Sequence, residues 1–205
     1  MTTVVLYHHI QGLTDGVQSF AEQLRQGGHA VHTPDLFDGR TFDTIEEGME
    51  FARHAGFADL AERGVAAAAA ISPEAVYAGF SFGVVPAQQL AQTRPGVRGA
   101  VLMCACLPVT EFGDAWPEGV PVQVHGKDAD PFFAEVLAAA EALVESTDRG
   151  ALFLYSGHEH LFADSSLPAY DPTAAALLVE RVLAFLEMIE VEGLQFRRRD
   201  TARLS

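Results

Sequence analysis

Cysteine is nearly absent from this sequence, and so is any signal for export. The 205 residues include only Cys104 and Cys106, which stand two apart on an apparent buried strand and cannot close a long loop with a stabilising disulfide. The first residues lead straight into a strand, without the basic start and the apolar stretch of a signal peptide. These absences indicate a reducing compartment, and we expect a cytoplasmic protein.

Basic residues are also scarce. Lys and Arg number 13 against 28 Asp and Glu, which gives a net charge of −15 at pH 7. Nucleic acids and anionic membrane surfaces both require clustered Lys and Arg on the protein, and no apolar run approaches the roughly 18 residues that could span a membrane. We therefore expect a small molecule as the partner, with no nucleic acid and no membrane. The oligomeric state stays open.

What is present is a globular composition. Hydrophobic residues make up 49% of the chain and charged residues 20%, and a chain of this length suits one domain with a substantial core. The stretch from Gln195 to Ser205 is basic, whereas the rest is acidic. We predict a single domain over residues 1–190 and a basic C-terminal tail over residues 191–205, either solvated or used for docking.

Strand and helix patterns alternate about six times along the chain. Short apolar runs predict strands, and apolar residues at helical spacing, with capping residues, predict the helices between them. The expected strands are residues 4–7, 30–33, a run from residue 76 into Gly79, 97–106, 121–125 and 151–155. Among the expected helices are one that opens at Thr44, one over residues 60–71 and one that opens at Asp171. This order predicts an α/β fold, with a mostly parallel sheet of six to seven strands and helices on both faces.

One stretch organises the rest of the chain. It is Gly79-Phe80-Ser81-Phe82-Gly83, where a strand meets a helix. Gly-x-Ser-x-Gly at such a place is typical of a nucleophile elbow, a sharp turn that holds the Ser in strained backbone geometry above the sheet. A Cβ at either glycine would collide with the neighbouring strand or helix. The plainer interpretation is a Gly-rich turn with a buried Ser, and we favour the nucleophile.

A Ser hydroxyl is a poor nucleophile at neutral pH, so it needs a base and an acid that orients the base. In an open α/β sheet such groups lie on loops after the carboxyl ends of strands. Asp128 and Asp130 follow the fifth expected strand. His158 and His160 follow the sixth. The chain order Ser, Asp, His is that of α/β-hydrolases, but the residues alone leave both pairs open.

Acyl transfer also needs donors for the oxyanion that develops as the Ser attacks a carbonyl. In this arrangement they are two backbone N–H groups, one from the residue after the nucleophile and one from the loop after the first strand. Here those residues are Phe82 and Ile10. Each donor typically contributes about 3 kcal/mol.

Four short motifs resemble the dienelactone hydrolase family, over a stretch from Val4 to about Leu186. Val-Leu-Tyr-His-His-Ile-Gln-Gly at residues 5–12 resembles that family's strand ending in His-Glu-Ile-x-Gly. Thr-Pro-Asp-Leu-Phe at residues 33–37 resembles its Pro-Asp-Leu-Tyr loop. Asp-Pro-Phe-Phe from residue 130 is similar to its Asp-x-Phe-Val, and His-Leu-Phe-Ala from residue 160 to its His-x-Phe-x around the catalytic base.

The resemblance implies an α/β-hydrolase fold and a carboxylic ester hydrolase without a cofactor. It selects Asp130 and His160 as the acid and the base, and leaves Asp128 and His158 as neighbours. The resulting hypothesis is a serine esterase or lactonase. Ser81 would attack the carbonyl of a small ester, and water would then release the acyl group.

The sequence also departs from the family pattern. Characterised dienelactone hydrolases look to have a Cys nucleophile held by a Glu on the first loop, where this chain has Ser81 and His9. The two changes agree, because a neutral hydroxyl needs no carboxylate beside it. An Arg that the family uses for the substrate carboxylate corresponds here to Asp164. A neutral ester or lactone therefore fits better than an anionic dienelactone.

Several side chains near the expected catalytic edge are candidates for a substrate pocket. They are His9, Phe37, Phe80, Phe112, Trp116 and Phe162. Each aromatic residue could instead belong to the core, and His9 could simply cap a loop.

Two other functions fit the sequence. One is a non-catalytic ligand-binding protein that keeps the fold. The other is a metal-dependent hydrolase that uses a cluster of histidines, because imidazole and carboxylate groups bind zinc. The candidate ligands would be His8, His9, His158, Glu159 and His160. Their spacing matches no known zinc motif, and we expect no metal.

Overall fold

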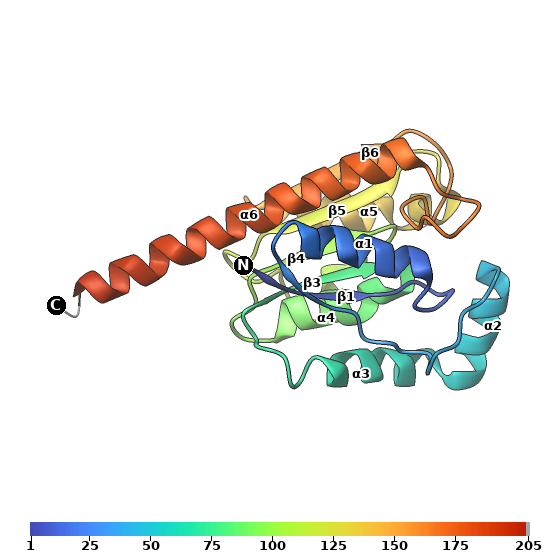
Figure 1. Ribbon diagram of the computed structural model, residues 1–205, viewed down its shortest axis with the longest axis horizontal. Coiled ribbons are helices and arrows are strands. Elements are labelled where there is room, and N and C mark those ends of the chain that lie inside the picture. The colour runs from blue at the N-terminus through green and yellow to red at the C-terminus, as the bar shows by residue number, and fades with distance from the viewer. Residues whose placement is uncertain (204–205) are drawn as a thin grey trace.

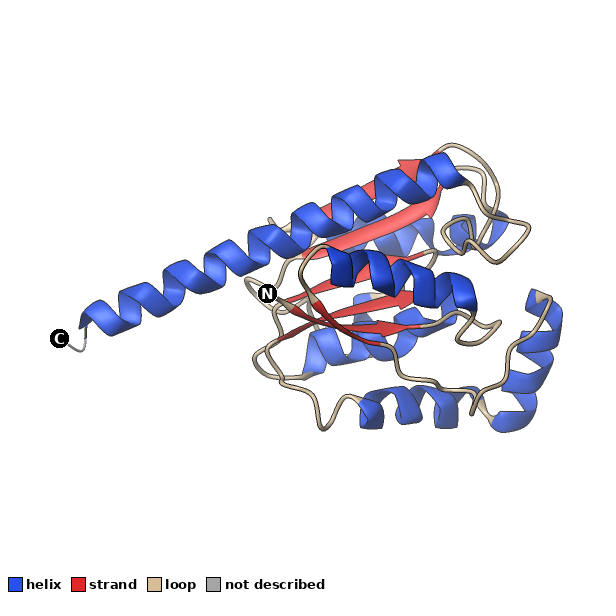
Figure 2. Ribbon diagram, viewed as in Figure 1, coloured by secondary structure: helices blue, strands red, loops and turns tan. Residues whose placement is uncertain are grey.

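The computed structural model describes residues 1–203, apart from the side chains of Leu194 and of residues 196–203. Parallel strands form one six-stranded sheet in the order β2-β1-β3-β4-β5-β6 (Figure 2). The strands are β1 (Thr3–Tyr7), β2 (Ala30–His32), β3 (Ala75–Phe80), β4 (Gly99–Met103), β5 (Val122–Lys127) and β6 (Gly150–Tyr155). The predicted α/β fold with a mostly parallel sheet is confirmed.

Helices cover both faces of this sheet, as predicted (Figure 1). They are α1 (Asp15–Gln26), α2 (Ile45–Ala55), α3 (Phe57–Ala67), α4 (Val84–Thr93), α5 (Pro131–Glu145) and α6 (Pro172–Arg203). On one face α1 and α6 share an apolar core with the strands, through residues such as Phe20 and Leu178. On the other face α3, α4 and α5 form a second core, through Leu60, Leu90 and Phe133. The central strands β3 and β4 are buried along their whole length, which explains why their sequences are apolar at every position.

Two predicted boundaries were wrong. β4 is shorter than the strand expected at residues 97–106, because Cys104 has a φ of 64° and this left-handed backbone ends the strand. The helix expected at residues 60–71 is α3, which begins at Phe57 and ends at Ala67. Beyond it the backbone tightens into turns that join residues three apart, and these do not continue an α-helix.

α2 lies beyond the carboxyl ends of the strands (Figure 1). Its predicted cap is present: the Thr44 hydroxyl accepts a hydrogen bond from Glu47 N at 3.2 Å, and the Glu47 carboxylate accepts one from Asp43 N at 3.2 Å. Gly48 faces the loop after β1, where a Cβ would come within 2.1 Å of the Ile10 carbonyl oxygen. The helix therefore packs closely over that loop and forms one side of the edge where the strands end.

α6 begins where Asp171-Pro172 predicts it. The Asp171 Oδ1 accepts hydrogen bonds from Thr173 N at 3.0 Å and Ala174 N at 3.1 Å, which is an N-cap. The helix continues without a break past residue 190 to Arg203, and its last part extends beyond the body (Figure 1). The proposed tail over residues 191–205 thus begins inside a helix, and its role stays a prediction. No helix in the part of the chain that the structure describes is long and apolar enough to span a membrane.

The parallel arrangement brings several loops to one edge of the sheet. β1 pairs with β2 on one side and β3 on the other, so the strand order reverses between β1 and β3. Ligands of open α/β sheets bind at such a reversal, outside the carboxyl ends of the strands. The loops that meet there follow β1, β3, β5 and β6, and they carry the catalytic residues that the sequence predicts.

Candidate active site

The turn after β3 has the geometry of a nucleophile elbow. Ser81 has a φ of 48°, a backbone conformation that is strained for a residue with a side chain. A Cβ at Gly79 would lie 2.2 Å from the Gly83 carbonyl oxygen, and a Cβ at Gly83 would lie 2.6 Å from the carbonyl oxygens of Tyr7 and His8. Both glycines are therefore required for the strand, the turn and the next helix to pack this closely.

Three predicted side chains form one hydrogen-bonded chain. Ser81 Oγ lies 2.8 Å from His160 Nε2, and His160 Nδ1 lies 2.7 Å from Asp130 Oδ2. Asp130 is buried, and its other carboxylate oxygen accepts a hydrogen bond from Phe132 N at 2.9 Å as the N-cap of α5. The carboxylate fixes the imidazole with its Nδ1–H toward Asp130, so Nε2 is left to accept the Ser81 proton.

Asp128 and His158 have other surroundings. Asp128 Oδ1 accepts a hydrogen bond from Gly157 N at 3.0 Å and so connects the two loops. The His158 side chain is 78% exposed, and its Nε2 lies 3.8 Å from Glu159 Oε1. Of the two pairs that the residue pattern left open, Asp130 and His160 are the members that the hydrogen bonds connect to Ser81.

The two predicted oxyanion donors lie on adjoining segments. Phe82 follows Ser81 at the start of the elbow's 3₁₀ turn. The loop with Ile10 follows β1, whose last carbonyl group packs against Gly83 of the elbow. Ile10 is buried beneath α2. Close packing of the elbow against the β1 end therefore keeps the two segments together.

Apart from Ser81, the departures from the family pattern are His9 and Asp164, and these two form a buried pair. His9 Nε2 lies 2.7 Å from Asp164 Oδ2, and His9 Nδ1 accepts a hydrogen bond from Gln11 N at 3.2 Å. Thr14 Oγ1 also donates to Asp164, and Ser166 donates to its other oxygen from both N and Oγ. Burial alone would raise the pKa of Asp164, but hydrogen bonds from His9, Ser166 and Thr14 outweigh burial and lower it to about 2. No pattern in the sequence indicates that these distant positions meet.

Most of the predicted pocket residues lie in the core instead. His9, Phe37, Phe80 and Phe162 are almost completely buried among other side chains. Trp116 is also buried, and its Nε1 donates to Val120 O at 2.8 Å. The reason is that the apolar residues next to the catalytic loops fill the space beneath them. Of these residues, only Phe112 is partly exposed.

The cavity that contains His160 has different walls. Its volume is about 260 Å³, and it lies between the start of α2 and the loop that leads to α6. Phe132 is the aromatic residue of this cavity, with its ring 4.8 Å from the His160 ring. Its walls are Gln11, Asp43, Thr44, Ile45, Glu46, Phe132, His160, Leu161, Leu167, Pro168 and Ala169, and so include no Lys or Arg. Phe132 is not among the pocket residues expected from the sequence, although its position two residues after Asp130 could have indicated the site.

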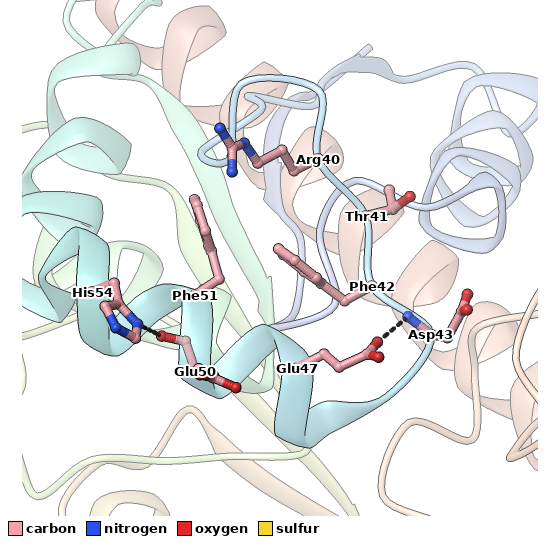
Figure 3. Close-up of a pocket in the computed structure, with 8 residues that line it drawn as sticks. All are labelled: Arg40, Thr41, Phe42, Asp43, Glu47, Glu50, Phe51 and His54. Atoms are coloured by element: carbon pink, nitrogen blue, oxygen red, sulfur yellow. Dashed lines mark hydrogen bonds between the residues drawn. The ribbon is translucent and has the colours of Figure 1, made fainter.

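A second, more open cavity of about 600 Å³ lies along α2 and the loop before it (Figure 3). Phe42 and Phe51 stand side by side in it, with ring centroids 5.2 Å apart. The Arg40 guanidinium lies 5.3 Å from the centre of the Phe51 ring. Asp43 lines both this cavity and the one at His160, so the two recesses adjoin.

The histidines and Glu159 do not form a metal site. His8 is buried between two backbone partners, with Nδ1 2.7 Å from His9 O and Nε2 accepting from Leu36 N at 3.0 Å. His9 and His160 are bound to different carboxylates. Among the side chains that the structure describes, no group of three or more His, Cys, Asp or Glu residues could hold a metal ion. The alternative of a metal site at these histidines is not supported, because His8, His9 and His160 are hydrogen-bonded to other groups.

The sequence model of the dienelactone hydrolase family matches residues 1–190. The chain belongs to this family. The search of curated proteins found no significant match. Several solved structures share the fold of this dienelactone hydrolase family member at low sequence identity, so they support the fold alone.

One of these structures is a dienelactone hydrolase-like promiscuous phosphotriesterase from metagenomic libraries, with a TM-score of 0.73 and 22% identity over 92% of this chain and 87% of that one. Another is a dienelactone hydrolase from Anabaena variabilis, with a TM-score of 0.64 and 21% identity over 91% and 86% of the two chains. A third is the RedJ thioesterase of prodiginine biosynthesis in Streptomyces coelicolor, with a TM-score of 0.59 and 16% identity over 87% and 84%. All three superpose over most of both chains.

Proposed function

We propose that this dienelactone hydrolase family member is a serine esterase or lactonase that acts through an acyl-enzyme. The observation that carries the proposal is the hydrogen-bonded chain from Ser81 Oγ through His160 to Asp130, at 2.8 and 2.7 Å. A hydroxyl, an imidazole and a buried carboxylate in this order supply a nucleophile, a base and the group that orients the base.

Each residue has a defined role in the proposed reaction. His160 Nε2 takes the proton as Ser81 Oγ attacks the ester carbonyl, and Asp130 stabilises the imidazolium that forms. The backbone N–H groups of Phe82 and Ile10 hold the oxyanion. His160 then returns the proton to the departing alcohol. Water, activated by the same imidazole, releases the acid and restores Ser81.

The charges around the site favour a neutral substrate. No Lys or Arg lines the cavity at His160, whereas Asp43 and Glu46 do. Asp164, which stands where the family pattern has an Arg for the substrate carboxylate, is held in its pair with His9. A small neutral ester or lactone is therefore the proposed substrate class, since nothing in this cavity would pair with an anionic group.

A fluorophosphonate probe and p-nitrophenyl acetate test the proposal together. We expect the wild type to hydrolyse the ester and to gain the mass of one phosphonyl group on Ser81. Ser81→Ala should lose both, with kcat/KM reduced about a thousandfold or more. Ser156→Ala, in the loop after β6 that carries His160, should keep both and serves as the matched control.

Two outcomes would contradict it. Full turnover by the Ser81→Ala variant would assign the reaction to another residue. If the folded wild type shows neither labelling nor turnover across a panel of esters and lactones, that result would instead support a non-catalytic ligand-binding protein.

A further inference from the structure

A buried lysine lies where the loop after β5, which carries Asp130, meets the loop after β6, which carries His160. Lys127 is the last residue of β5, and its side chain is 2% exposed. Its ammonium donates hydrogen bonds to Glu159 Oε2 at 2.6 Å and to Asp171 Oδ2 at 2.8 Å. Burial disfavours the charge of Lys127, but the bonds to Asp171 and Glu159 outweigh it and raise the pKa. The residue is therefore a buried cation that binds two carboxylates.

These two carboxylates belong to opposite ends of one segment. We call residues 156–171, between β6 and α6, the histidine loop. Glu159 directly precedes His160, and Asp171 caps α6 at the far end of the loop. The loop is drawn together further by a hydrogen bond from Asp171 N to Phe162 O at 2.9 Å. One ammonium thus fastens the loop on both sides of the imidazole.

The same lysine is joined to the residue that orients the imidazole. Asp130 follows Lys127 by one tight turn, with Asp130 N 3.4 Å from Lys127 O. Ala129 N donates to Gly157 O at 3.0 Å. Gly157 has a φ of 124°, and a Cβ there would lie 2.6 Å from Lys127 Nζ. The chain therefore leaves space for the ammonium at the point where the two loops touch.

Stability alone gives little reason for this arrangement. Burying an ammonium costs several kcal/mol before its ion pairs return any of it, and an apolar side chain of similar length often serves stability as well or better. Catalysis gives a stronger reason, because a misplacement of about 1 Å in a catalytic group can reduce a rate about 100-fold. A charge bound to both ends of the histidine loop limits that movement.

We propose that Lys127 is a positioning residue, whose ammonium holds the histidine loop so that the His160 imidazole stays aligned with Ser81. This inference rests on the proposed function, and it goes further by assigning to a residue outside the hydrogen-bonded chain a measurable part of the rate. The group does not touch the substrate. Its effect passes through Glu159 and Asp171.

The first test is kinetic, with kcat expressed per Ser81 that a fluorophosphonate titrates. Lys127→Met should lower kcat about 10- to 100-fold and leave KM within about twofold. Because that variant also leaves two carboxylates unpaired, the partly exposed Glu159→Gln and Asp171→Asn are made as well. Each should lower kcat about threefold or more and retain the folded state. Adding Glu159→Gln or Asp171→Asn to Lys127→Met should not lower kcat further, because the ion pair with Lys127 is already broken.

Glu192→Gln is the matched control. It breaks the 2.7 Å ion pair between Arg149 and Glu192, which lies at the other end of β6. The chemical change is the same as in Glu159→Gln, so a loss of stability alone would affect both. We expect the kcat of Glu192→Gln to equal that of the wild type.

A proton NMR spectrum separates failure of this inference from failure of the proposed function. The Nδ1–H of an imidazole bonded to a carboxylate gives a low-field signal that needs no turnover. The signal should be present in the wild type and in Glu192→Gln, and lost or broadened in Lys127→Met. A wild type without activity but with this pattern would overturn the function and keep the positioning role. An unchanged signal and unchanged kcat in folded Lys127→Met, or additive losses in the double variants, would overturn the role of Lys127.

Discussion

At the scale of single residues, His9 and Asp164 show what a sequence cannot supply. Residue type and place after strands predicted Ser81 and narrowed the Asp and the His to one pair each, because those places are set by the parallel sheet, and the family resemblance selected Asp130 and His160. It also identified His9 and Asp164, but as separate departures from the family pattern. Their meeting depends on how the loop after β1 packs against the histidine loop, over a separation of 155 residues. No local pattern encodes that contact.

This pair leads to a prediction about stability. The pKa of Asp164 is about 2 in the folded protein, below its ordinary value of 3.8. A depressed carboxyl pKa contributes stability that is present above the unfolded pKa and is lost as the pH falls toward the folded one. Asp164→Asn should therefore lower the free energy of unfolding at pH 7 by about 1 to 2 kcal/mol. Urea unfolding of the variant and the wild type at pH 7 measures this difference in free energy.

The same experiment at low pH provides the check. At pH 3 the difference between Asp164→Asn and the wild type should be smaller than at pH 7, because the wild type has begun to lose the contribution. Asp114→Asn, at an exposed site, should show no difference at either pH. Equal stability of Asp164→Asn and wild type at pH 7 would show that the pair gives no net stabilisation.

At the scale of elements, the predicted order of strands and helices was correct, and the errors were at the ends. Residue patterns indicate which segments are apolar, and the chain stays apolar for several residues after β4 ends at Met103. What ends the strand is the left-handed backbone of Cys104, which bends the chain directly after the last paired residues; Cys104 N still donates a hydrogen bond to His125 O at 2.7 Å. That bend follows from tertiary packing. Gly79 and Gly83 are the opposite case, because the motif itself required them.

The elbow glycine Gly83 gives an element-scale prediction. A Cβ there would meet the carbonyl oxygens of Tyr7 and His8 at 2.6 Å, and both are backbone atoms that cannot move aside alone. Gly83→Ala should therefore lower the free energy of unfolding by about 3 kcal/mol. Gly113→Ala is the control, because the nearest atom to its Cβ would be 3.9 Å away. Thermal unfolding that ranks the two variants equally would contradict the close packing of elbow and β1.

At the scale of the whole molecule, two buried histidines make stability depend on pH. Burial lowers the pKa of His8 to about 4. Burial, with Arg181 nearby, lowers the pKa of His125 to about 3. Both groups therefore stay neutral in the fold well below the pH at which an unfolded chain would protonate them. Between pH 6.5 and 4 the unfolded state binds more protons than the folded state. The contribution of the two neutral histidines to the free energy of unfolding is therefore complete above pH 6.5 and decreases as the pH falls.

We expect the free energy of unfolding to fall by about 3 kcal/mol or more between pH 7 and pH 4. Urea unfolding at several pH values gives the slope. His125→Gln should flatten this slope, although the variant starts from a lower stability because His125 bonds Tyr155 and Gln123. His54→Gln, at an exposed site, should keep the wild-type slope. A wild type that is equally stable at pH 7 and pH 4 would contradict the burial of two neutral imidazoles.

The net charge of −15 acts on the substrate as well as on the fold. A field of one sign lowers the local concentration of like-charged ligands, and it does so more at low salt. Asp43 and Glu46 place two of these charges in the wall of the cavity at His160. Of two p-nitrophenyl esters that differ only in a terminal carboxylate or carboxamide, the anionic one should show a kcat/KM about tenfold lower at low salt. The difference in kcat/KM between the two esters should decrease as salt is added.

Variants assign this preference to the cavity or to the molecule as a whole. Asp43→Asn with Glu46→Gln should raise kcat/KM for the anionic ester severalfold and leave the neutral ester almost unchanged. Glu145→Gln, an exposed residue at the end of α5, removes the same kind of charge far from the cavity wall and should change neither. If the anionic ester is the better substrate of the wild type, a cation outside the described cavity wall must bind it. If the double variant and Glu145→Gln change the preference alike, the preference comes from net charge, and Asp43 and Glu46 have no special part in it.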